Sequence, residues 1–585
     1  MPRFSECWRC TKASASVACR YCEVAKYCSN RCKDNDVARH TDAECRPVFL
    51  INTCLSCRKV GSSLQKCAGC YRAFYCDVTC QMKHRNEHKD ECKKSVEKVK
   101  LLARRLGMYF LQKSARTCMA HYYWGNIPAF DYLNLSENEG ADYSSDMNLL
   151  VLGVGDLRNI VLTCASLPES FRSKIKFTLN DSDRCALARV VLFLYMLIKC
   201  DSSVGNIITE IWYSTVLSEK TYNYLIESLK GLLGIGNANG LMSATDGLVN
   251  ISENRYQEIN TVWSQWLDLS VEDSSNIQEQ RQKAMRKDPG SFEGKMLYCN
   301  TIPRKYRASA VKYMEDGVFQ CTAKCSFAQN PTLTGPPILF DNEPFTYCVP
   351  TSVLPFAGWD YIEIKKFNDR NSLISMYGNY IQSKLVDVMH KLHAKQISFD
   401  LVLGDCMKIE ELLNKEEKFD RILTSNLMDY ILLPELLSVY SDKLNRSNDY
   451  ATLITYCQNW VNFCPDGDVS LSPEASQFTH LCKILVQDTK DPRLCEGRTN
   501  FREYLDNSGE WQDYLRALFY AYQKRYKTEE TSKLPTINQL GNEFQLRLRD
   551  GYRNENRIAF FKPAVNRRRV TMITGLERFM EWVPN

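Results

Sequence analysis

The sequence predicts an α/β protein in which two small metal-stabilised modules precede a larger domain of alternating strands and helices. Two observations carry this prediction. A ladder of cysteine and histidine residues occurs twice between residues 7 and 92, and short apolar runs that end in glycine or acidic residues begin at residue 147. The 585 residues leave room for several domains, and 44% hydrophobic with 25% charged residues is ordinary for a globular protein.

The ladder consists of eight metal-ligand residues. Its first copy contains Cys7, Cys10, Cys19, Cys22, Cys28, Cys32, His40 and Cys45, and its second contains Cys54, Cys57, Cys67, Cys70, Cys76, Cys80, His88 and Cys92. Seven thiolates and one imidazole complete two tetrahedral zinc sites, so the two copies predict four zinc ions. Because every such site would have four protein ligands, the pattern favours a structural role over zinc catalysis.

Metal would supply much of the folding free energy of these modules. A segment of about 40 residues buries too little apolar surface to fold by itself, and structural zinc contributes about 10–16 kcal/mol per ion. The alternative is a disulfide framework. We expect no such framework, because Met1-Pro2-Arg3 begins no apolar signal segment. The expected compartment is therefore the cytoplasm, with the nucleus as the alternative.

The ladder resembles the MYND-type zinc finger in both copies, which we call finger 1 and finger 2. The resemblance rests on Tyr27 before Cys28, Phe74-Tyr75 before Cys76, and the stretch from Cys80 to Cys92. It implies that the zinc sites of each finger are interleaved. In finger 1 one site would use Cys7, Cys10, Cys28 and Cys32, and the other Cys19, Cys22, His40 and Cys45. In finger 2 one site would use Cys54, Cys57, Cys76 and Cys80, and the other Cys67, Cys70, His88 and Cys92. It also implies protein interaction, often with proline-containing peptides. His84 is expected at the surface or in support of the ligands.

The charge balance argues against nucleic acid as the partner. Four zinc ions would add eight positive charges and fourteen thiolates would remove fourteen, which brings the formal charge of +6 to zero. The longest apolar run, residues 190–198, is too short to span a bilayer, so we expect a buried helix there and no membrane segment. Arg567-Arg568-Arg569 lies in a strand-like segment, 558–574, which favours a structural role over nuclear targeting.

A second pattern begins after the fingers. The apolar run 147–152 ends at Gly153-Val154-Gly155, a helix is predicted over 157–167, and the strand 174–179 ends at Asn180-Asp181. The pattern resumes far downstream, where strand 399–403 ends at Gly404-Asp405 and a further strand begins near Phe419. This order resembles a class I S-adenosylmethionine-dependent methyltransferase. The predicted fold class is therefore α/β: tandem zinc-binding domains, then a methyltransferase-like (Rossmann-like) domain with a large, mainly helical insertion.

A closer resemblance covers most of residues 100–585. The motifs from Leu150 to Ile160, Leu179-Asn180-Asp181, and Thr424 to Tyr430 are similar to an uncharacterised domain family that includes dynein axonemal assembly factors and fungal MYND-finger proteins. The resemblance implies a role in complex assembly, with dynein assembly components as candidate partners.

These patterns divide the chain into seven segments. Fingers 1 and 2 occupy residues 1–48 and 49–93, and a connecting helix occupies 94–130. The first half of the Rossmann-like domain spans 140–205, the insertion 206–395, the second half 396–470, and the C-terminal region 471–585.

Within the insertion, helices are predicted over 207–233 and 256–269, and the polar stretch 273–286 is predicted to be mobile. The stretch 331–359 is proline-rich and irregular. Its Gly335-Pro336-Pro337 could be an ordinary loop, or a proline-containing peptide held by the protein's own fingers.

A bound S-adenosylmethionine would contact four residues: Gly153, Gly155, Asp181 and Asp405. A third glycine is absent, and Arg158 stands where close approach is needed. The alternative is a ligand-free fold in which Asp156 caps the helix and Arg158 pairs with Asp181 or Asp183. We therefore favour a scaffold or assembly module over an enzyme. The alternative function is a methyltransferase that acts on a partner recruited by the fingers.

Overall fold

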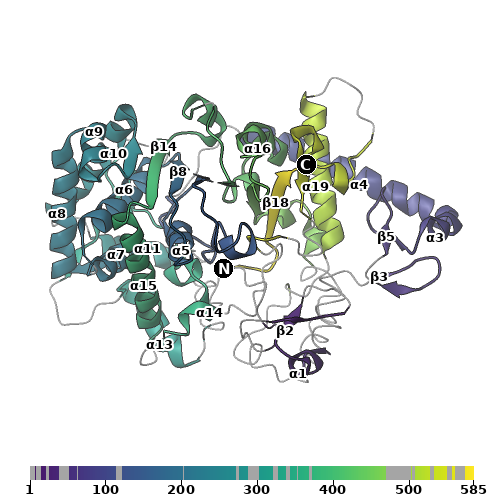
Figure 1. The fold of residues 1–585 in the computed structure, drawn as a ribbon, viewed down its shortest axis with the longest axis horizontal. Coiled ribbons are helices and arrows are strands. Elements are labelled where there is room, and N and C mark those ends of the chain that lie inside the picture. The colour runs from purple at the N-terminus through teal and green to yellow at the C-terminus, as the bar shows by residue number, and fades with distance from the viewer. Residues whose placement is uncertain are drawn as a thin grey trace. The chain divides into compact units, whose positions relative to one another are not determined.

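The structure is a computed structural model. It describes residues 7, 9, 15–20, 25–37, 52–61, 64–113, 121–201, 203–271, 276–287, 302, 304–319, 327–337, 343–351, 353–367, 372–414, 416–468, 502, 507–526, 533–549, 556–559 and 573–585. The chain forms two compact units, shown in Figure 1. Unit 1 comprises Met1–Arg116, Asn426–Asn566 and Thr574–Asn585, and unit 2 comprises Thr117–Ser425 and Arg567–Ile573. No helix in the described part of the chain is long and apolar enough to cross a membrane.

Unit 2 contains a parallel sheet with the strand order β10-β14-β8-β7-β15. These strands are β7 (Met147–Leu152), β8 (Ile175–Asp181), β10 (Val249–Ile251), β14 (Ile397–Leu403) and β15 (Arg421–Leu423). Their apolar runs suit strands that are buried on both faces. The register pairs Leu152 with Asn180 and Leu403 with Asp181. The carboxyl ends of β7, β8 and β14 therefore meet at one edge of the sheet, where the predicted cofactor residues lie.

The N-termini of the two helices that follow β7 and β8 are capped in different ways. Helix α6 (Arg184–Lys199) starts at Asp183, whose side chain accepts a hydrogen bond from the Cys185 amide. Helix α5 (Arg158–Ala165) has no side-chain bond at its N-cap, Leu157, but the Asp156 carboxylate accepts from the Arg158 amide at 3.2 Å. Aromatic packing joins two neighbouring strands, since Phe177 and Phe399 stack with ring centroids 5.7 Å apart.

The insertion is helical but differs from the prediction in two places. The single helix predicted over 207–233 is two helices, α7 (Val204–Tyr213) and α8 (Glu219–Ile235), separated by β9 (Val216–Ser218), which pairs with β11 (Phe327–Gln329). The stretch 273–286 lies largely in a helix, α11. The remaining elements are α9 (Ala238–Ala244), α10 (Glu253–Val271), α11 (Ile277–Lys287), η3 (Arg304–Tyr306), α13 (Arg307–Asp316), η4 (Pro331–Leu333), β12 (Thr334–Gly335), β13 (Thr346–Tyr347), η5 (Pro355–Gly358), α14 (Tyr361–Ile364) and α15 (Leu373–His393).

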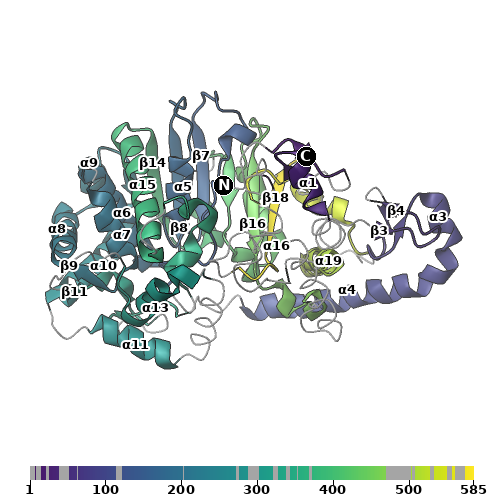
Figure 2. The same cartoon turned by 90° about the horizontal axis from the view of Figure 1, so that it is seen from below.

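Unit 1 has a three-stranded antiparallel arrangement in which β18 (Arg578–Pro584) pairs with β16 (Thr452–Cys457) and with β17 (Leu546–Leu548). Its helices include α4 (Arg85–Lys113), α16 (Leu433–Tyr440) and α19 (Ser508–Tyr526). Helix α4 packs against α19, and Figure 2 shows it passing across that helix. The helix predicted over 94–130 thus begins earlier, inside finger 2, and residues 121–130 are not helical.

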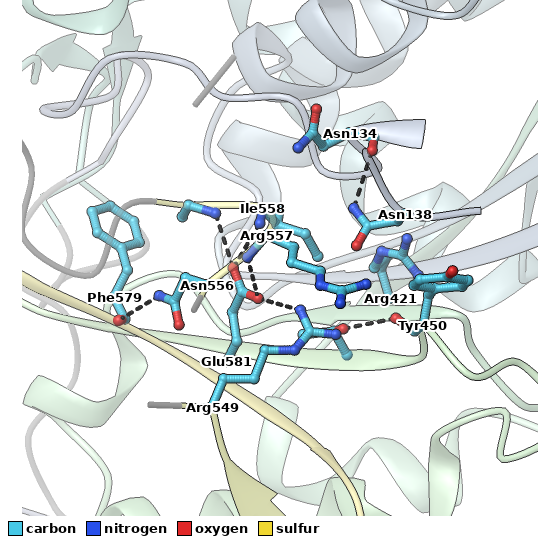
Figure 3. A network of polar contacts seen from close by, with 12 residues as sticks. Asn134, Asn138, Arg421, Tyr450, Arg549, Asn556, Arg557, Ile558, Phe579 and Glu581 are labelled. Atoms are coloured by element: carbon cyan, nitrogen blue, oxygen red, sulfur yellow. Dashed lines mark hydrogen bonds and ion pairs between the residues drawn. The ribbon is translucent and has the colours of Figure 1, made fainter. Parts of the chain in front are cut away.

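A buried carboxylate organises the end of unit 1. Glu581 on β18 is fully buried and accepts hydrogen bonds from the Arg549 guanidinium at 2.5 Å and from the backbone amides of Arg557, Ile558 and Ala559 at 2.7–3.0 Å (Figure 3). A buried charge persists only when it is paired and hydrogen-bonded, and this one is. Glu581 therefore fastens the segment 556–559 to β18. The predicted Arg567-Arg568-Arg569 segment lies outside the described residues.

Candidate metal centres and the glycine loop

Finger 2 gathers its eight predicted ligands into two groups of four. Within each group the ligand atoms all lie within 4.8 Å of one another: Cys54, Cys57, Cys76 and Cys80 form the first group, and Cys67, Cys70, His88 and Cys92 the second. These are the sets implied by the interleaved pairing. Two sulfurs on a tetrahedral zinc, each about 2.3 Å from the ion, are about 3.8 Å apart. The Cys67 and Cys92 sulfurs are 3.8 Å apart, and the Cys70 sulfur is 3.3 Å from His88 Nε2.

Local structure explains how each pair of cysteines reaches one point. In both C-x2-C turns an amide donates back to the first cysteine, from Arg58 to the Cys54 carbonyl and from Tyr71 to the Cys67 carbonyl. Arg58 and Tyr71 adopt left-handed backbone conformations, with φ of 64° and 58°. The short helix α3 (Val78–Lys83) carries Cys80, and α4 carries His88 and Cys92 on successive turns.

The ligand atoms of the second group are closely packed. A β-carbon added at Gly69 would lie 2.8 Å from the Cys92 sulfur. His88 Nδ1 is buried and has no hydrogen-bond partner among the described residues. Cys70 donates to Cys67, which lowers the pKa of Cys67 to about 4, whereas this contact and burial raise the pKa of Cys70. Neighbouring sulfurs that share a proton in this way are the arrangement expected of a metal site, because a bound cation would deprotonate all of them.

His84 is close to the ligands but outside both groups. Its Nδ1 is 3.1 Å from the Tyr75 hydroxyl, and its ring stacks on His88 with centroids 6.2 Å apart. It therefore supports the ligand His88 and the buried ring of Tyr75.

Finger 1 repeats the local contacts of finger 2. The amide of Cys19 donates to Ala25, as that of Cys67 does to Ala73. Ser29 caps α1 (Asn30–Asp34) at Cys32, as Asp77 caps α3 at Cys80. The ligand atoms of Cys7, Cys28 and Cys32 lie within 4.8 Å of one another, with the last two sulfurs 3.6 Å apart. The other predicted ligands Cys10, Cys22, His40 and Cys45 lie outside the described residues.

Finger 2 also docks on the C-terminal part of unit 1, which no sequence signal indicated. The Arg72 guanidinium forms ion pairs with Glu510 and, at 2.5 Å, with Asp513 on α19. The neighbouring Tyr71 ring lies 4.9 Å from the Arg516 guanidinium, and its hydroxyl accepts from the Ile537 amide at 3.0 Å. The turn that brings Cys67 and Cys70 together is therefore the surface by which finger 2 packs against α19.

The glycine loop after β7 has its polar groups already paired. Gly153 and Gly155 adopt φ of 60° and 55°. The Gly155 amide donates to the Asp181 carboxylate at 2.9 Å, and a β-carbon at Gly155 would lie 2.9 Å from the Tyr122 carbonyl oxygen. The two groups expected to contact a cofactor thus bond each other, beneath the chain's own segment 121–125.

Asp156 and Arg158 close the loop further. Arg158 Nη1 lies 2.5 Å from Asp156 Oδ1, and the other Asp156 oxygen accepts from the Gly125 amide at 2.9 Å. The predicted pairing of Arg158 with Asp181 or Asp183 is wrong, because Arg158 pairs with Asp156, which is buried on the same turn. Gly125 is required here, since a β-carbon on it would lie 1.7 Å from the Arg158 guanidinium carbon.

The partner of Asp183 is His121. His121 Nδ1 lies 2.7 Å from the Asp183 carboxylate, and its Nε2 lies 2.8 Å from the Pro336 carbonyl oxygen. Although burial opposes it, the bond to Asp183 raises the pKa of His121 above its usual value. The Gly335-Pro336-Pro337 segment is therefore engaged by unit 2 itself through its middle residue.

The remaining predicted cofactor residues are paired as well. Asp405 accepts from the Met407 amide at 2.9 Å at the start of η6 (Cys406–Glu411). Burial and the neighbouring Asp183 carboxylate raise the pKa of Asp181 to about 6. A ribose-binding carboxylate needs free acceptor capacity, but both Asp181 oxygens already accept hydrogen bonds, one from the Gly155 amide and one from the Asp183 amide. Gly153, Gly155, Asp181 and Asp405 lie at one sheet edge, but in this conformation they do not fit a bound S-adenosylmethionine.

The residues after β15 are structural in the same sense. Asp429, in the 3-10 helix η7 (Leu427–Asp429), is buried and accepts from the Cys457 thiol and from the amides of Gln458 and Asn459 at 3.0–3.1 Å. It fastens η7 to the end of β16, and both of its oxygens are engaged there.

Residues 54–92 match the MYND finger family, and residues 123–217 match a domain of unknown function, DUF4470. Finger 2 is therefore a MYND finger, the class of zinc finger that its eight ligands define. Dynein axonemal assembly factor 3 of Xenopus laevis is 27% identical to this chain over 118 residues, which are 18% of this chain and 24% of that protein. The match thus covers about a quarter of that relative's length. No solved structure matches the chain significantly.

Proposed function

We propose that the chain is a zinc-dependent protein-interaction and assembly module in which finger 2 presents the binding surface. The observation that carries this proposal is the arrangement of finger 2 in unit 1. Its Tyr71–Arg72 turn is used for docking on α19, while three large apolar side chains of the same finger remain exposed: Val60, Val78 and Met82, with exposed fractions of 48%, 60% and 68%. Exposed apolar anchors on a rigid, metal-braced module suit an apolar or proline-containing peptide.

A labelled proline- and leucine-containing peptide tests this surface by fluorescence anisotropy on the full zinc-loaded chain. We expect the double variant Val78→Ser/Met82→Ser to weaken binding at least tenfold with unchanged zinc content. The matched control is Met242→Ser, which changes an exposed methionine of α9 in unit 2. Equal binding by the finger variant and the control would contradict the proposal.

We propose further that finger 1 also binds two zinc ions, so that the chain holds four. The support is that three contacts of finger 2 recur in finger 1. Two are the backbone bond and the helix cap described above, and the third is the Tyr27–Asp36 bond at 3.0 Å, which corresponds to Tyr75–His84 in finger 2. Metal analysis of the intact chain should give about four zinc equivalents if all sixteen ligands are used.

For unit 2 we propose a methyltransferase-like fold that serves as a scaffold. The strand order β14-β8-β7-β15 supports the fold, because it corresponds to the 3-2-1-4 order of doubly wound nucleotide-binding sheets. The mutual pairing of Gly155 and Asp181 supports the scaffold over the enzyme.

Calorimetry with S-adenosylmethionine separates the two. We expect no detectable heat of binding to the full chain, and no effect of Asp181→Ala on peptide binding by finger 2. Saturable binding that Asp181→Ala abolishes would instead favour the alternative function, a methyltransferase acting on a partner brought by the fingers.

The name of the relative extends the proposal to a biological setting. We propose that this chain assists the assembly of a multisubunit complex in the cytoplasm, with axonemal dynein as the specific candidate. Affinity purification of the tagged chain from cells that build axonemes should recover dynein chains in a manner that depends on Val78 and Met82. Recovery that is insensitive to both residues would separate this role from finger 2.

A further inference from the structure

Helix α4 presents a second exposed face, distinct from the surface of finger 2. The opposite side of the helix is buried against α19 and includes Leu102, Leu106 and Phe110. On the outward side Leu101 and Met108 are 58% and 61% exposed. Apolar side chains on a packed helix are normally turned inward, so three large exposed ones on this helix, Leu101, Met108 and Leu111, require an explanation.

The two residues form one stripe with a defined geometry. Leu101 and Met108 are seven positions apart, which is two helical turns and about 10 Å along the axis. The exposed residues Arg104 and Arg105 lie between them in sequence. At about 100° per residue, Arg104 falls on one side of the stripe and Arg105 on the other. We call these four residues the α4 stripe.

The charge of the stripe is of one sign. From residue 98 to residue 113 the sequence contains five lysines and arginines and no acidic residue. Lys98 pairs with Asp466 and Lys100 with Glu97. Arg104 and Arg105 form no ion pair within the part of the chain that the structure describes. Two unpaired guanidinium groups therefore flank an exposed apolar pair on a rigid helix.

We propose that the α4 stripe binds an acidic amphipathic helix of a partner protein. Two apolar residues one heptad apart would pack between Leu101 and Met108, and carboxylates beside them would pair with Arg104 and Arg105. A second copy of the chain is a poorer occupant, because antiparallel or parallel pairing of two stripes would oppose arginine to arginine. An anionic membrane is also poorer, because the three exposed apolar side chains of α4 bury too little apolar area for an interfacial helix.

The experiment uses the full zinc-loaded chain and three designed, labelled helical peptides of equal length. The first has leucines at heptad spacing flanked by glutamates, the second has the same leucines flanked by lysines, and the third has the glutamates with serines in place of the leucines. We expect binding of the first only, weakened at least tenfold by Leu101→Ser/Met108→Ser and by Arg104→Glu/Arg105→Glu, and falling with added salt. The charge-reversed variant should bind the lysine peptide instead.

Controls keep the test specific. Lys220→Glu/Lys230→Glu on α8 makes the same charge change at exposed positions and should bind the glutamate peptide normally. Val78→Ser/Met82→Ser should also bind normally, which separates this stripe from the proposed finger 2 surface. Equal binding of the glutamate and lysine peptides would overturn the proposal. So would stripe-dependent self-association in sedimentation, or stripe-dependent binding to phosphatidylserine vesicles without binding to the glutamate peptide.

Discussion

The second ligand group of finger 2 and the glycine loop after β7 were both predicted to bind a ligand, and they differ in what their polar atoms already contact. In finger 2 the sulfurs of Cys67 and Cys92 approach to 3.8 Å, and the Cys70 sulfur lies 3.3 Å from His88 Nε2. In the glycine loop the Gly155 amide and the Asp181 carboxylate bond each other at 2.9 Å.

This difference distinguishes finger 2, whose polar atoms are arranged for a ligand, from the glycine loop, which keeps only the sequence motif of a ligand site. Crowded thiols cannot all ionise at low cost, since each thiolate that forms opposes the ionisation of its neighbours. A metal ion removes that cost. A backbone amide and a carboxylate that satisfy one another need no ligand, and a ligand would have to replace their bond. Both motifs predicted a ligand, so the state of the donors and acceptors is the better guide to binding.

The largest effect is expected from removing one zinc ligand. Cys67→Ser should lower the zinc content of the chain by about one to two equivalents and unfold finger 2, because each structural zinc is worth about 10–16 kcal/mol. Metal analysis and circular dichroism measure both effects. Cys200→Ser, outside the fingers, should keep the full zinc content. If both variants kept all their zinc, the ligand assignment would be wrong.

The next effect tests whether finger 2 is held by metal only or also by α19. Arg72→Ala leaves the buried Asp513 carboxylate unpaired and should reduce the free energy of unfolding of unit 1 by about 3 kcal/mol, measured by urea denaturation with zinc present. Lys59→Ala changes the exposed residue at the equivalent position, two residues after the last cysteine of the other turn, and should change stability by less than about 0.5 kcal/mol. A double variant that adds Asp513→Ala should recover part of the loss.

A pH-dependent effect tests the glycine loop, the second region of the comparison, through Asp181. The pKa of Asp181 is raised to about 6 from an ordinary 3.8, so the folded state holds this proton more tightly than the unfolded state. The associated stability is present below about pH 4 and is lost as the pH rises through 6. Asp181→Asn cannot lose a proton, and its stability relative to wild type should therefore rise by about 2 kcal/mol between pH 4 and pH 7.5.

The matched control is Asp201→Asn. Hydrogen bonds from Ser203 lower the pKa of Asp201, so the relative stability of this variant should not rise over the same pH interval. A flat difference for Asp181→Asn would mean that its carboxylate is well solvated and open to a ligand.

The smallest effect concerns the cover over the glycine loop. Gly155→Ala should cost about 2 kcal/mol, because it combines a left-handed backbone with a contact to the Tyr122 carbonyl oxygen. Gly247→Ala has a similar positive φ of 79° but open space around its β-carbon, and should cost about 1 kcal/mol. Thermal unfolding of both variants measures the difference. Equal losses would indicate that segment 121–125 moves off the loop easily.

The sequence predicted what local spacing determines. The ligand ladder repeats with the spacing that brings four side chains to one point, and the two groups in finger 2 follow it. The strands that end at Gly153, Asp181 and Gly404 were also predicted, because buried parallel strands have apolar runs with abrupt ends. Polar composition misled the prediction for 273–286, where tertiary packing buries Ile277 and Arg281 and holds the stretch as α11.

Contacts between distant segments were beyond the reach of the sequence. Arg72 pairs with Glu510, which lies 438 positions later, and no local pattern marks either residue. The ion pair between Arg158 and Asp156 likewise depends on Gly125, because the absence of a side chain there makes room for the guanidinium. The covering of the glycine loop by 121–125 therefore could not be predicted from the motif that it covers.

Helix α4 has a practical consequence for dissecting this protein. The helix begins within finger 2, carries His88 and Cys92 of the second ligand group, and continues without interruption to the residues that pack on α19. A cut at the apparent boundary near residue 93 would split one helix into two. The fragment after the cut would lack the first turns of the helix that carries Val99 and Leu102. The fragment before the cut would lack α19, on which finger 2 packs. Finger 2 and the C-terminal helix are best expressed, mutated and studied as one piece.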